Sequence, residues 1–316
     1  MDLLRTLNKN PFKGYYPEGW DWGRIDACCA NPPETVLDRQ DFWNKDFMPI
    51  QCQSLSDFEV YLGYEIAKEI KLARDEGKQL VLILPVGPMG MYRWAVYFLR
   101  DWGVKCNHVY GFNMDEWSDE NGNTLPASDP ATFENAMIGA FYGPLGELTV
   151  PQSNRYFATK DVLPSYADII ADLREKGARM ITVYGIGRAF HIAFWEPHYA
   201  AEYESDDEWK RATHRIGAML HPLTIEQNAL TSFRSRTGLV SACANTVGPG
   251  LFLQSDRCIG GCDGALSRGM QWQGQSLWVT LRHGPSRWIT SSFMPTLPGK
   301  LFFLKELAGP LIPDTN

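Results

Sequence analysis

Apolar positions recur at strand and helix spacing from about residue 48 onward, and they predict an alternation of strands with helices. The first pair is a short strand at Met48–Gln53 and an amphipathic helix at Ser56–Glu76. Ser56 is the expected N-cap of this helix, and Gly77 is expected to end it. The same pattern predicts strands at Leu80–Leu84, His108–Phe112 and Arg179–Tyr184, and helices at Tyr92–Trp102, Ala131–Tyr142 and Tyr166–Lys176.

The strand at Leu80–Leu84 is apolar at every position, which is typical of a strand covered on both faces. Strands that alternate with helices form a parallel sheet with helices on both faces, so the expected fold class is α/β. Ligands of such sheets bind outside the carboxyl ends of the strands. Three segments follow strands and are expected to meet there: Val86–Met91, Asn113–Trp117 and Gly185–Pro197.

The two ends of the chain show weaker periodicity. Residues 1–48 are rich in Trp, Tyr, Pro and Cys, and we expect them to form an arm that packs on the body or on a neighbouring subunit, which leaves a homo-oligomer open. Residues 49–316 contain no repeat or linker and are expected to form a single domain. The predictions for the C-terminal third are a surface helix at Glu202–Lys210, strands at Leu239–Gly250, Leu277–Leu281 and Ser286–Ser292, a turn at Gly260–Gly264, and a strand or helix at Leu301–Leu307.

Composition narrows the functional classes. Of the 316 residues, 44% are hydrophobic and 21% charged, which is typical of a globular protein with a sizeable core. The net charge of −7 gives no bulk attraction for nucleic acid or an anionic membrane, so neither is an expected partner. No apolar run approaches the ~20 residues of a membrane span, and the first residues lack the apolar stretch of a signal peptide. The seven scattered cysteines favour a reducing cytoplasm over a disulfide framework.

Metal and nucleotide motifs are absent from the sequence. Cys258 and Cys262 have the spacing of half a metal site, but no matching Cys or His pair follows, so we interpret them as ordinary thiols and expect no metal. The turn Gly185–Phe190 lacks the third glycine of a dinucleotide fingerprint, which disfavours a nicotinamide enzyme. The chain also has no P-loop and no Gly-x-Ser-x-Gly elbow.

Adjacent carboxylates, Asp115 and Glu116, come just after the predicted strand at His108–Phe112. In an extended segment neighbouring side chains point to opposite sides, so one can face a ligand while the other supports the loop. A carboxylate partly removed from water has a raised pKa and can act as a general base. An acidic loop in solvent is the competing interpretation, because exposed acids are common.

His191 lies five residues before Glu196, and both follow the turn Gly185-Ile-Gly187 at a strand end. A carboxylate near a histidine can fix its tautomer and raise its basicity. Such a pair suits proton transfer between sugar oxygens, whereas the alternative is a histidine that only stabilises the turn. The apolar residues after His191 indicate that the segment is buried.

The loop Gly87-Pro-Met-Gly90 opens a helix after a strand, where backbone N–H groups can bind an anion. The motif is weak, because the loop has Met89 at its centre and neither a hydroxyl nor a lysine. Arg93 and Arg188 are the nearest cations in the sequence. The residues expected to contact a substrate are Gly87, Met89, Gly90, Glu116, Gly187 and Arg188.

Two motifs together resemble the glucosamine-6-phosphate deaminase/isomerase family, whose wider superfamily includes 6-phosphogluconolactonases. They are Phe112-Asn-Met-Asp-Glu-Trp117 and Gly185-Ile-Gly-Arg-Ala-Phe-His-Ile-Ala-Phe-Trp-Glu-Pro197. The earlier loop at Leu84–Gly87 and the segment Ser128–Phe133 agree as well, and the resemblance spans roughly residues 48 to 305.

The resemblance implies a Rossmann-like three-layer α/β/α sandwich with a mostly parallel sheet, and an enzyme without metal or organic cofactor. It implies that Asp115 moves a proton between C1 and C2 of an open-chain sugar or sugar phosphate. It further implies that His191 assists ring opening and that Glu196 holds and tunes His191.

The sequence departs from the family pattern at both parts of the expected site. Ala189 stands where the family has an acid, and Phe190 stands where it has glycine. Met89 replaces the threonine of the family's phosphate loop, and Leu230 and Gly264 fall near positions where the family has Arg and Lys. The joint loss of hydroxyl and cationic ligands suggests a substrate without phosphate, or a phosphate held differently.

Three hypotheses follow for the function. The first is a sugar isomerase or deaminase-like enzyme that uses Asp115, His191 and Glu196. The second is a hydrolase of the lactonase type, in which His191 activates water. The third is a sugar-binding protein that has lost catalysis, since one acid of the family's set is missing.

Overall fold

The computed structural model describes residues 6, 7, 9–266 and 270–312. The central strands are β1 (Phe47–Cys52), β2 (Leu80–Leu84), β3 (Val109–Asn113), β5 (Arg155–Tyr156), β6 (Arg179–Gly185), β9 (Arg257–Cys262) and β10 (Gly299–Leu304). They form one sheet of seven strands in the order β1-β10-β9-β6-β2-β3-β5, with every neighbouring pair parallel. This arrangement confirms the predicted α/β class and the mostly parallel sheet.

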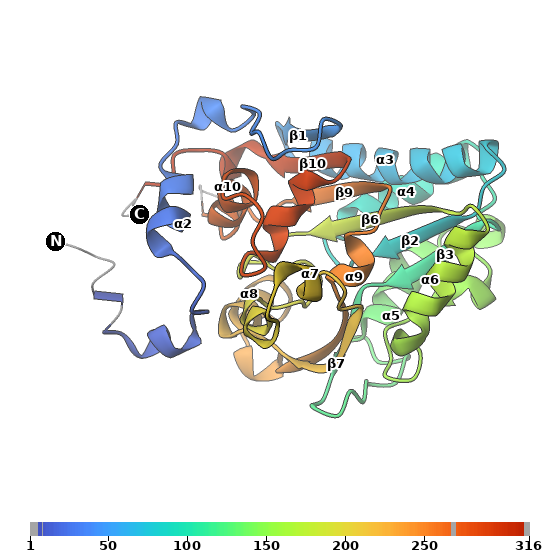
Figure 1. The fold of residues 1–316 in the computed structure, drawn as a ribbon. Coiled ribbons are helices and arrows are strands. Elements are labelled where there is room, and N and C mark those ends of the chain that lie inside the picture. Colours follow the sequence, from blue (N-terminus) through green and yellow to red (C-terminus); the bar gives the residue numbers. More distant parts are fainter. Residues whose placement is uncertain (1–5, 8, 267–269, 313–316) are drawn as a thin grey trace.

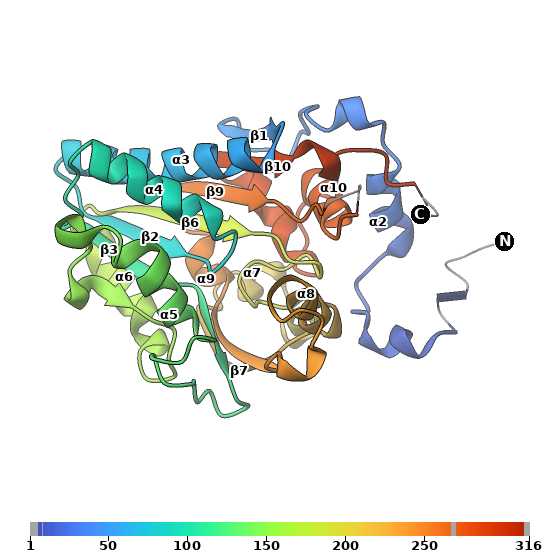
Figure 2. The ribbon, with the colours of Figure 1, turned by 180° about the vertical axis from the view of Figure 1, so that it is seen from behind.

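Helices cover both faces of this sheet. In chain order, the α-helices are α2 (Trp22–Cys29), α3 (Leu55–Asp75), α4 (Gly90–Asp101), α5 (Phe133–Met137), α6 (Tyr166–Glu175), α7 (Asp206–Trp209), α8 (Pro222–Ser232), α9 (Pro249–Phe252) and α10 (Gly274–Arg282). Figures 1 and 2 show α3 and α4 together on one face, with α6 and α9 on the other. Gly63 lets α3 and α4 approach closely, because a β-carbon there would lie 2.5 Å from the carbonyl oxygen of Met91. Among the described residues, no helix is both long and apolar enough to cross a membrane.

A second, antiparallel sheet stands beside the carboxyl ends of the parallel strands. It consists of β4 (Asp115–Ser118), β8 (Cys243–Val247) and β7 (His214–Met219), in that order. The segment after β3, treated as extended in the sequence analysis, forms β4, in which Asp115 pairs with Thr246 of β8. This pairing between distant segments places the predicted base on a strand.

Several predicted boundaries shift in the structure. Ser54, and not Ser56, is the N-cap of α3, since its hydroxyl accepts a hydrogen bond of 3.1 Å from the Asp57 amide. The helix predicted at Ala131–Tyr142 divides into α5 and a π-helical turn at Ile138–Tyr142. The acidic segment near residue 206 forms only the four-residue helix α7.

Three predictions in the C-terminal third are wrong. Leu277–Leu281 lies in the buried helix α10, where residues on every side are covered and no helical periodicity remains. Gly260 and Gly261 belong to the strand β9 and not to a turn. Gly260 is needed there because the ring of Tyr184 fills the space that a side chain would take. Ser286–Ser292 forms a turn and the start of a 3-10 helix instead of a strand.

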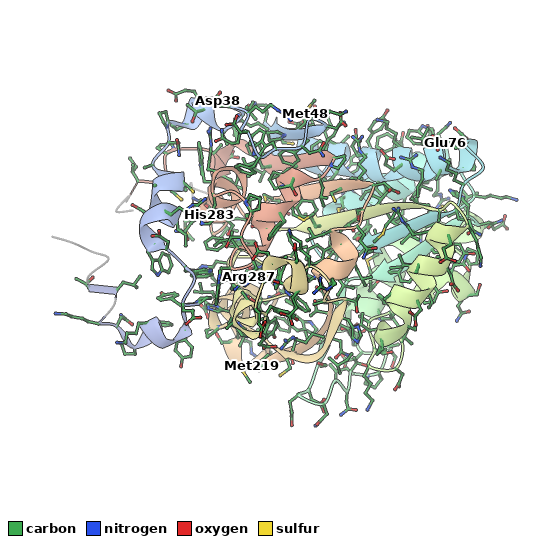
Figure 3. The ribbon with its side chains drawn as sticks, in the orientation of Figure 1. Asp38, Met48, Glu76, Met219, His283 and Arg287 are labelled. Atoms are coloured by element: carbon green, nitrogen blue, oxygen red, sulfur yellow. The ribbon has the colours of Figure 1, made fainter. Side chains whose placement is uncertain are left out.

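The N-terminal segment lies against the C-terminal part of the chain. The indole nitrogen of Trp20 donates to the carbonyl oxygen of Trp288 at 2.8 Å, and that of Trp43 donates to Leu281 at 3.0 Å. Arg24 of α2 donates to the carbonyl oxygen of His283, which lies beside this helix in Figure 3. These bonds hold the aromatic segment on the body of the protein.

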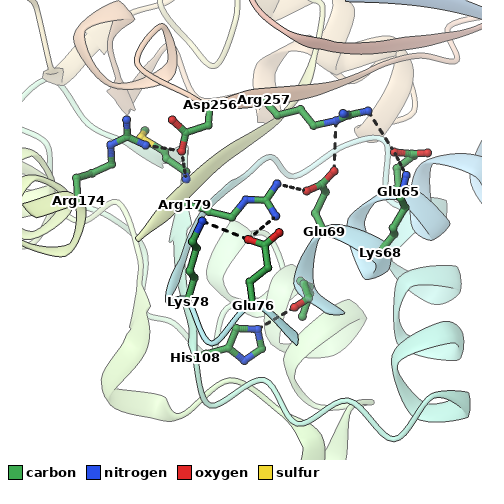
Figure 4. A network of polar contacts seen from close by, with 12 residues as sticks. Glu65, Lys68, Glu69, Glu76, Lys78, His108, Arg174, Arg179, Asp256 and Arg257 are labelled. Carbon is green, nitrogen blue, oxygen red and sulfur yellow. Dashed lines mark hydrogen bonds and ion pairs between the residues drawn. The ribbon is translucent and has the colours of Figure 1, made fainter. Parts of the chain in front are cut away.

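The amino end of the sheet carries a buried ion-pair network (Figure 4). Glu69 of α3 is 2% exposed and accepts a hydrogen bond of 2.8 Å from Arg179 at the start of β6. Its other oxygen lies 3.3 Å from Nε of Arg257 at the start of β9. Glu65, one turn earlier, pairs with Lys300 of β10. Each buried carboxylate therefore faces a cation, which ties α3 to three strands.

Candidate active site

The loops after β2, β6 and β9 meet at the carboxyl end of the sheet. A β-carbon built on Gly185 would lie 3.4 Å from the carbonyl oxygen of Gly87 and 4.0 Å from that of Gly261. Gly87 has φ +117°, a conformation that favours glycine, and lets the first loop turn back toward β6. Two of the three segments expected at the site therefore adjoin each other, and the loop after β9 joins them.

Asp115 is a buried carboxylate at the start of β4, 7% exposed. Burial raises its pKa well above the ordinary value, and the negative charge of Glu116 raises it further. No salt bridge to Asp115 occurs within the described residues. A carboxyl group with a raised pKa exchanges protons nearer neutral pH, which is what a general base requires.

Glu116 points its carboxylate at the backbone. Its oxygens accept hydrogen bonds from the amides of Trp117, Phe133 and Glu134 at 2.9, 3.0 and 2.9 Å. Burial raises the pKa of Glu116, while these three bonds oppose the rise. Glu116 thus holds the first turn of α5 against β4 and supports its neighbour Asp115, and its expected contact with substrate stays a prediction.

His191 is buried in the turn after β6. Its Nδ1 lies 3.1 Å from Oε2 of Glu196 and 3.1 Å from the hydroxyl of Thr224. A β-carbon on Gly187 would lie 1.9 Å from Nε2, so only glycine leaves space at this ring nitrogen. The predicted His–Glu pair therefore exists, and its free nitrogen faces the glycine turn.

Glu196 is fully buried at the end of this turn. Burial alone would raise its pKa, but the charge and hydrogen bond of His191, together with His221 and Thr224, outweigh burial and lower it. His221 accepts a bond of 3.1 Å from the Leu223 amide at Nδ1, so its Nε2–H donates to the carbonyl oxygen of Tyr15. Glu196 is thus an ionised carboxylate beside two imidazoles.

Thr246 of β8 connects the two halves of the site. It pairs with Asp115 across the antiparallel sheet, and its hydroxyl accepts a hydrogen bond of 2.9 Å from the amide of Phe194. The rings of Phe194 and Trp117, the latter on β4, lie 4.9 Å apart. The segments that carry Asp115 and His191 are therefore packed together.

Similarity to curated proteins covers part of the chain. A glucosamine-6-phosphate deaminase of Caenorhabditis elegans is 30% identical over 137 residues, which is 42% of this chain and 48% of the relative. A protein of the same name from Treponema denticola is 29% identical over 140 residues, 43% of this chain and 49% of the relative. The matched segments thus span about half the length of these relatives. No protein-family profile matches the chain.

Similarity to solved structures covers most of the chain. The structure of a monomeric glucosamine-6-phosphate deaminase, described as a missing link of the NagB superfamily, matches with a TM-score of 0.66. The match covers 82% of this chain and 98% of that one at 19% identity. The chain is thus similar in part of its sequence to glucosamine-6-phosphate deaminases and shares a fold with one of them. The 6-phosphogluconolactonase of Trypanosoma cruzi has a TM-score of 0.57, covering 87% of this chain and 100% of its own at 16% identity, which shows a shared fold.

The chain carries an aromatic residue inside its histidine turn. Phe190 adopts φ +61°, in the left-handed region that favours glycine. Its ring centroid lies 4.9 Å from that of Trp20, and its carbonyl oxygen accepts a bond of 2.8 Å from the Ser291 amide. Contacts from both ends of the chain thus compensate for the backbone strain next to His191.

The predicted substrate-binding residues occupy different surroundings. Met89 packs its side chain on the hydrophobic core, and Gly90 begins α4. The amide of Arg188 donates to Oε1 of Gln227 at 2.7 Å, which ties the turn after β6 to α8. Gly87 borders the start of the turn after β6, and Gly187 lies against the ring of His191 within that turn. Contact of these residues with a substrate stays a prediction.

Sequence reasoning missed several residues that hold the site. Gln273 donates to the carbonyl oxygen of Ile186 at 2.6 Å and accepts from the Gly264 amide at 2.8 Å, so it bridges the loops after β6 and β9. Tyr92 donates to the carbonyl oxygen of Pro85 at 2.6 Å. Thr224 and Gln227 come from α8, a helix that the sequence analysis did not predict. Among the described residues, no group of three or more His, Cys, Asp or Glu could hold a metal.

Proposed function

We propose that the chain is an enzyme that moves a proton between C1 and C2 of an open-chain amino sugar. The observation that carries this proposal is the pairing of a buried carboxyl group of raised pKa, Asp115, with the hydrogen-bonded couple His191 and Glu196. The similarity to glucosamine-6-phosphate deaminases adds the class of substrate.

Asp115 acts as the general base. Its carboxylate takes the proton from C2 of the aldehyde form, and the electron pair of that bond forms an enol at C1 and C2. Return of the proton to C1 gives a C2 imine, which water hydrolyses to a ketose and ammonia. Because burial and Glu116 raise the pKa of Asp115, the carboxylate is a stronger base than an ordinary aspartate and accepts this proton more readily.

His191 opens the sugar ring before this step. Glu196 holds Nδ1, so Nε2 at the glycine turn is the nitrogen that receives the anomeric hydroxyl proton and passes it to the ring oxygen. The ionised Glu196 stabilises the imidazolium formed during the transfer. Thr224 bonds the same nitrogen and fixes the plane of the ring.

The test is product analysis with glucosamine and glucosamine-6-phosphate as substrates. The proposal expects a ketose and an equal amount of ammonia from at least one of them. Neither product forming at any pH between 6 and 9, from protein that still binds the sugar in calorimetry, would contradict it.

A lactonase is the second candidate, since the same His–Glu couple can activate water and 6-phosphogluconolactonases share the fold. Ala189 bears on the choice, because the family resemblance puts an acid at that position in deaminases and the chain lacks it. Hydrolysis of a sugar lactone without ketose formation would select the lactonase over the isomerase.

A further inference from the structure

The N-terminal segment reaches the histidine turn through one tryptophan. Trp20 is 5% exposed, and its indole nitrogen donates to the carbonyl oxygen of Trp288 at 2.8 Å. A β-carbon on the preceding Gly19 would lie 2.2 Å from Cδ2 of Trp288, so the glycine lets the chain pass close to this indole. Helix α2, which follows Trp20, lies beside α10 (Figure 1). Trp20 is therefore held in place by the C-terminal part of the chain.

The indole of Trp20 packs on the turn that carries His191. Its ring centroid lies 4.9 Å from that of Phe190, the residue directly before His191. Ala189 and Phe190, the two residues of the turn that depart from the family pattern, are both buried. They form a small hydrophobic cluster with Trp20 and with Val279 of α10, separate from the main core. The N-terminal segment thus supplies part of the apolar packing of the turn.

The same indole contacts the second imidazole beside Glu196. The ring centroids of Trp20 and His221 lie 5.7 Å apart, with 37° between the ring planes. Nε2–H of His221 donates to the carbonyl oxygen of Tyr15 at 2.6 Å. His221 lies within electrostatic range of Glu196, the carboxylate that holds Nδ1 of His191. The N-terminal segment therefore reaches His191 by a second route.

Backbone hydrogen bonds connect Phe190 to His191 within the turn. The amide of Phe190 donates to the carbonyl oxygen of Gly187 at 3.0 Å, and the amide of Gly187 donates to that of His191 at 3.1 Å. Phe190 has φ +61°, so this backbone geometry persists only with support from outside the turn. A displacement of Phe190 would therefore move the imidazole of His191 relative to Glu196.

We propose that Trp20 is a positioning residue, which sets the orientation of His191 for ring opening by packing on Phe190 and on His221. Trp20 acts through these two residues and not on the sugar. This inference rests on the proposed function for the reaction step that it affects. The orientation of His191 can be measured without turnover, so the two can fail separately.

The kinetic test compares a ring-closed amino sugar with an open-chain analogue that cannot close its ring. Trp20→Leu removes the indole and keeps an apolar side chain. We expect it to lower kcat for the ring-closed sugar by about tenfold with little change in KM, because a small misplacement of a catalytic group is costly. The open-chain analogue should be nearly insensitive, since it needs no ring opening. Trp20→Phe keeps an aromatic ring beside Phe190 and should recover most of the lost turnover.

Trp43→Leu is the matched control. Trp43 is also 5% exposed and also donates its indole proton to a backbone carbonyl, that of Leu281 at 3.0 Å. It packs on Phe47 in the main core, and not in the cluster around Phe190. This variant should lose stability and leave turnover per folded molecule unchanged for both sugars.

NMR of protein labelled with ¹⁵N-histidine measures the orientation of His191 directly. The side-chain nitrogen signals of His191, assigned with His191→Asn, should shift in Trp20→Leu and stay in place in Trp43→Leu. Phe190→Gly removes the ring that Trp20 contacts and relieves the left-handed backbone strain. The same shift and the same selective loss of turnover are expected in it, so it provides the test if Trp20→Leu does not fold.

Two results would overturn the inference. One is an unshifted His191 signal in folded Trp20→Leu. The other is an equal loss of turnover for the ring-closed and open-chain sugars, which would assign Trp20 to the stability of the fold alone. A wild type that turns over neither sugar contradicts the proposed function, whereas the NMR comparison still decides whether Trp20 positions His191.

Discussion

The buried acids Glu65 and Glu69 at the amino end of the central sheet and Asp115 at its carboxyl end are held in opposite ways. At the amino end, Glu65 and Glu69 face Arg179, Arg257 and Lys300, so their charges are matched and they join α3 to the strands. At the carboxyl end, the charged neighbour of Asp115 among the described residues is a second carboxylate, Glu116, and burial together with this charge raises the pKa of Asp115. Buried carboxylates thus stabilise the fold at one end and are available for proton transfer at the other. A buried acid therefore indicates a functional site when its pKa is shifted and no cation neutralises its charge.

Removing the unmatched acid gives the largest expected effect on activity. Asp115→Asn should lower turnover of the amino sugar by about 10³-fold, within the range for loss of a general base. It should not lower the melting temperature. A carboxyl group whose folded pKa lies above its unfolded value loses stability as the pH rises between the two values, so the neutral amide is at least as stable at pH 7. A large drop in melting temperature would show that Asp115 is structural.

Removing a matched acid should have the reverse outcome. Glu69→Gln removes the nearest counter-charge of Arg179 and Arg257, and we expect it to reduce the free energy of unfolding by about 3 kcal/mol. Urea denaturation measures this loss. Turnover per folded molecule should stay within about twofold, and a larger change in turnover would remove the distinction between the two ends of the sheet.

Weakening the histidine couple is expected to have an intermediate effect on turnover. Glu196→Gln keeps a partner for Nδ1 of His191 but removes the charge that stabilises the imidazolium, so turnover should fall by about tenfold to a hundredfold. Steady-state kinetics on ring-closed and open-chain substrate analogues check the assignment. A sugar that cannot close its ring should be nearly insensitive to this variant if His191 acts in ring opening.

The smallest expected effect is on the pH dependence of turnover, and it identifies the base directly. The turnover rate should rise with pH as Asp115 loses its proton. The apparent pKa of this rise, the acid limb of the profile, should lie above the ordinary carboxyl value of about 4. Glu196, whose pKa is lowered, stays ionised throughout this range and contributes no limb. Glu69→Gln should keep the limb in place. A limb at or below pH 4 would contradict the assignment of Asp115 as the base.

Much of the first two thirds of the fold was predictable because its helices bury one face and its central strands are short runs of buried apolar residues. The α3 helix and the wholly buried β2 show the periodicities that sequence patterns detect. Helix α10 is covered around the stretch Leu277–Leu281, so its apolar run mimicked a strand. The pairing of β4 with β8 joins segments about 130 residues apart, which no local pattern contains.

The part of the site formed by residues close in the sequence was predictable as well. His191 and Glu196 are close in the sequence, and their hydrogen bond follows from one turn. The residues that complete the surroundings, Thr224 on α8 and Gln273 just before α10, reach the site from distant segments through tertiary packing. Their spacing carries no periodic pattern, so only the folded structure brings them together.

Exchange of the C2 proton of glucosamine in D₂O, followed by proton NMR, tests the central claim most directly, because it isolates the step assigned to Asp115. The wild type should replace the C2 proton with deuterium faster than it forms ammonia or at the same rate, and Asp115→Asn should slow the exchange by about 10³-fold. Exchange in Asp115→Asn at the wild-type rate would contradict the assignment of Asp115 as the base that moves this proton.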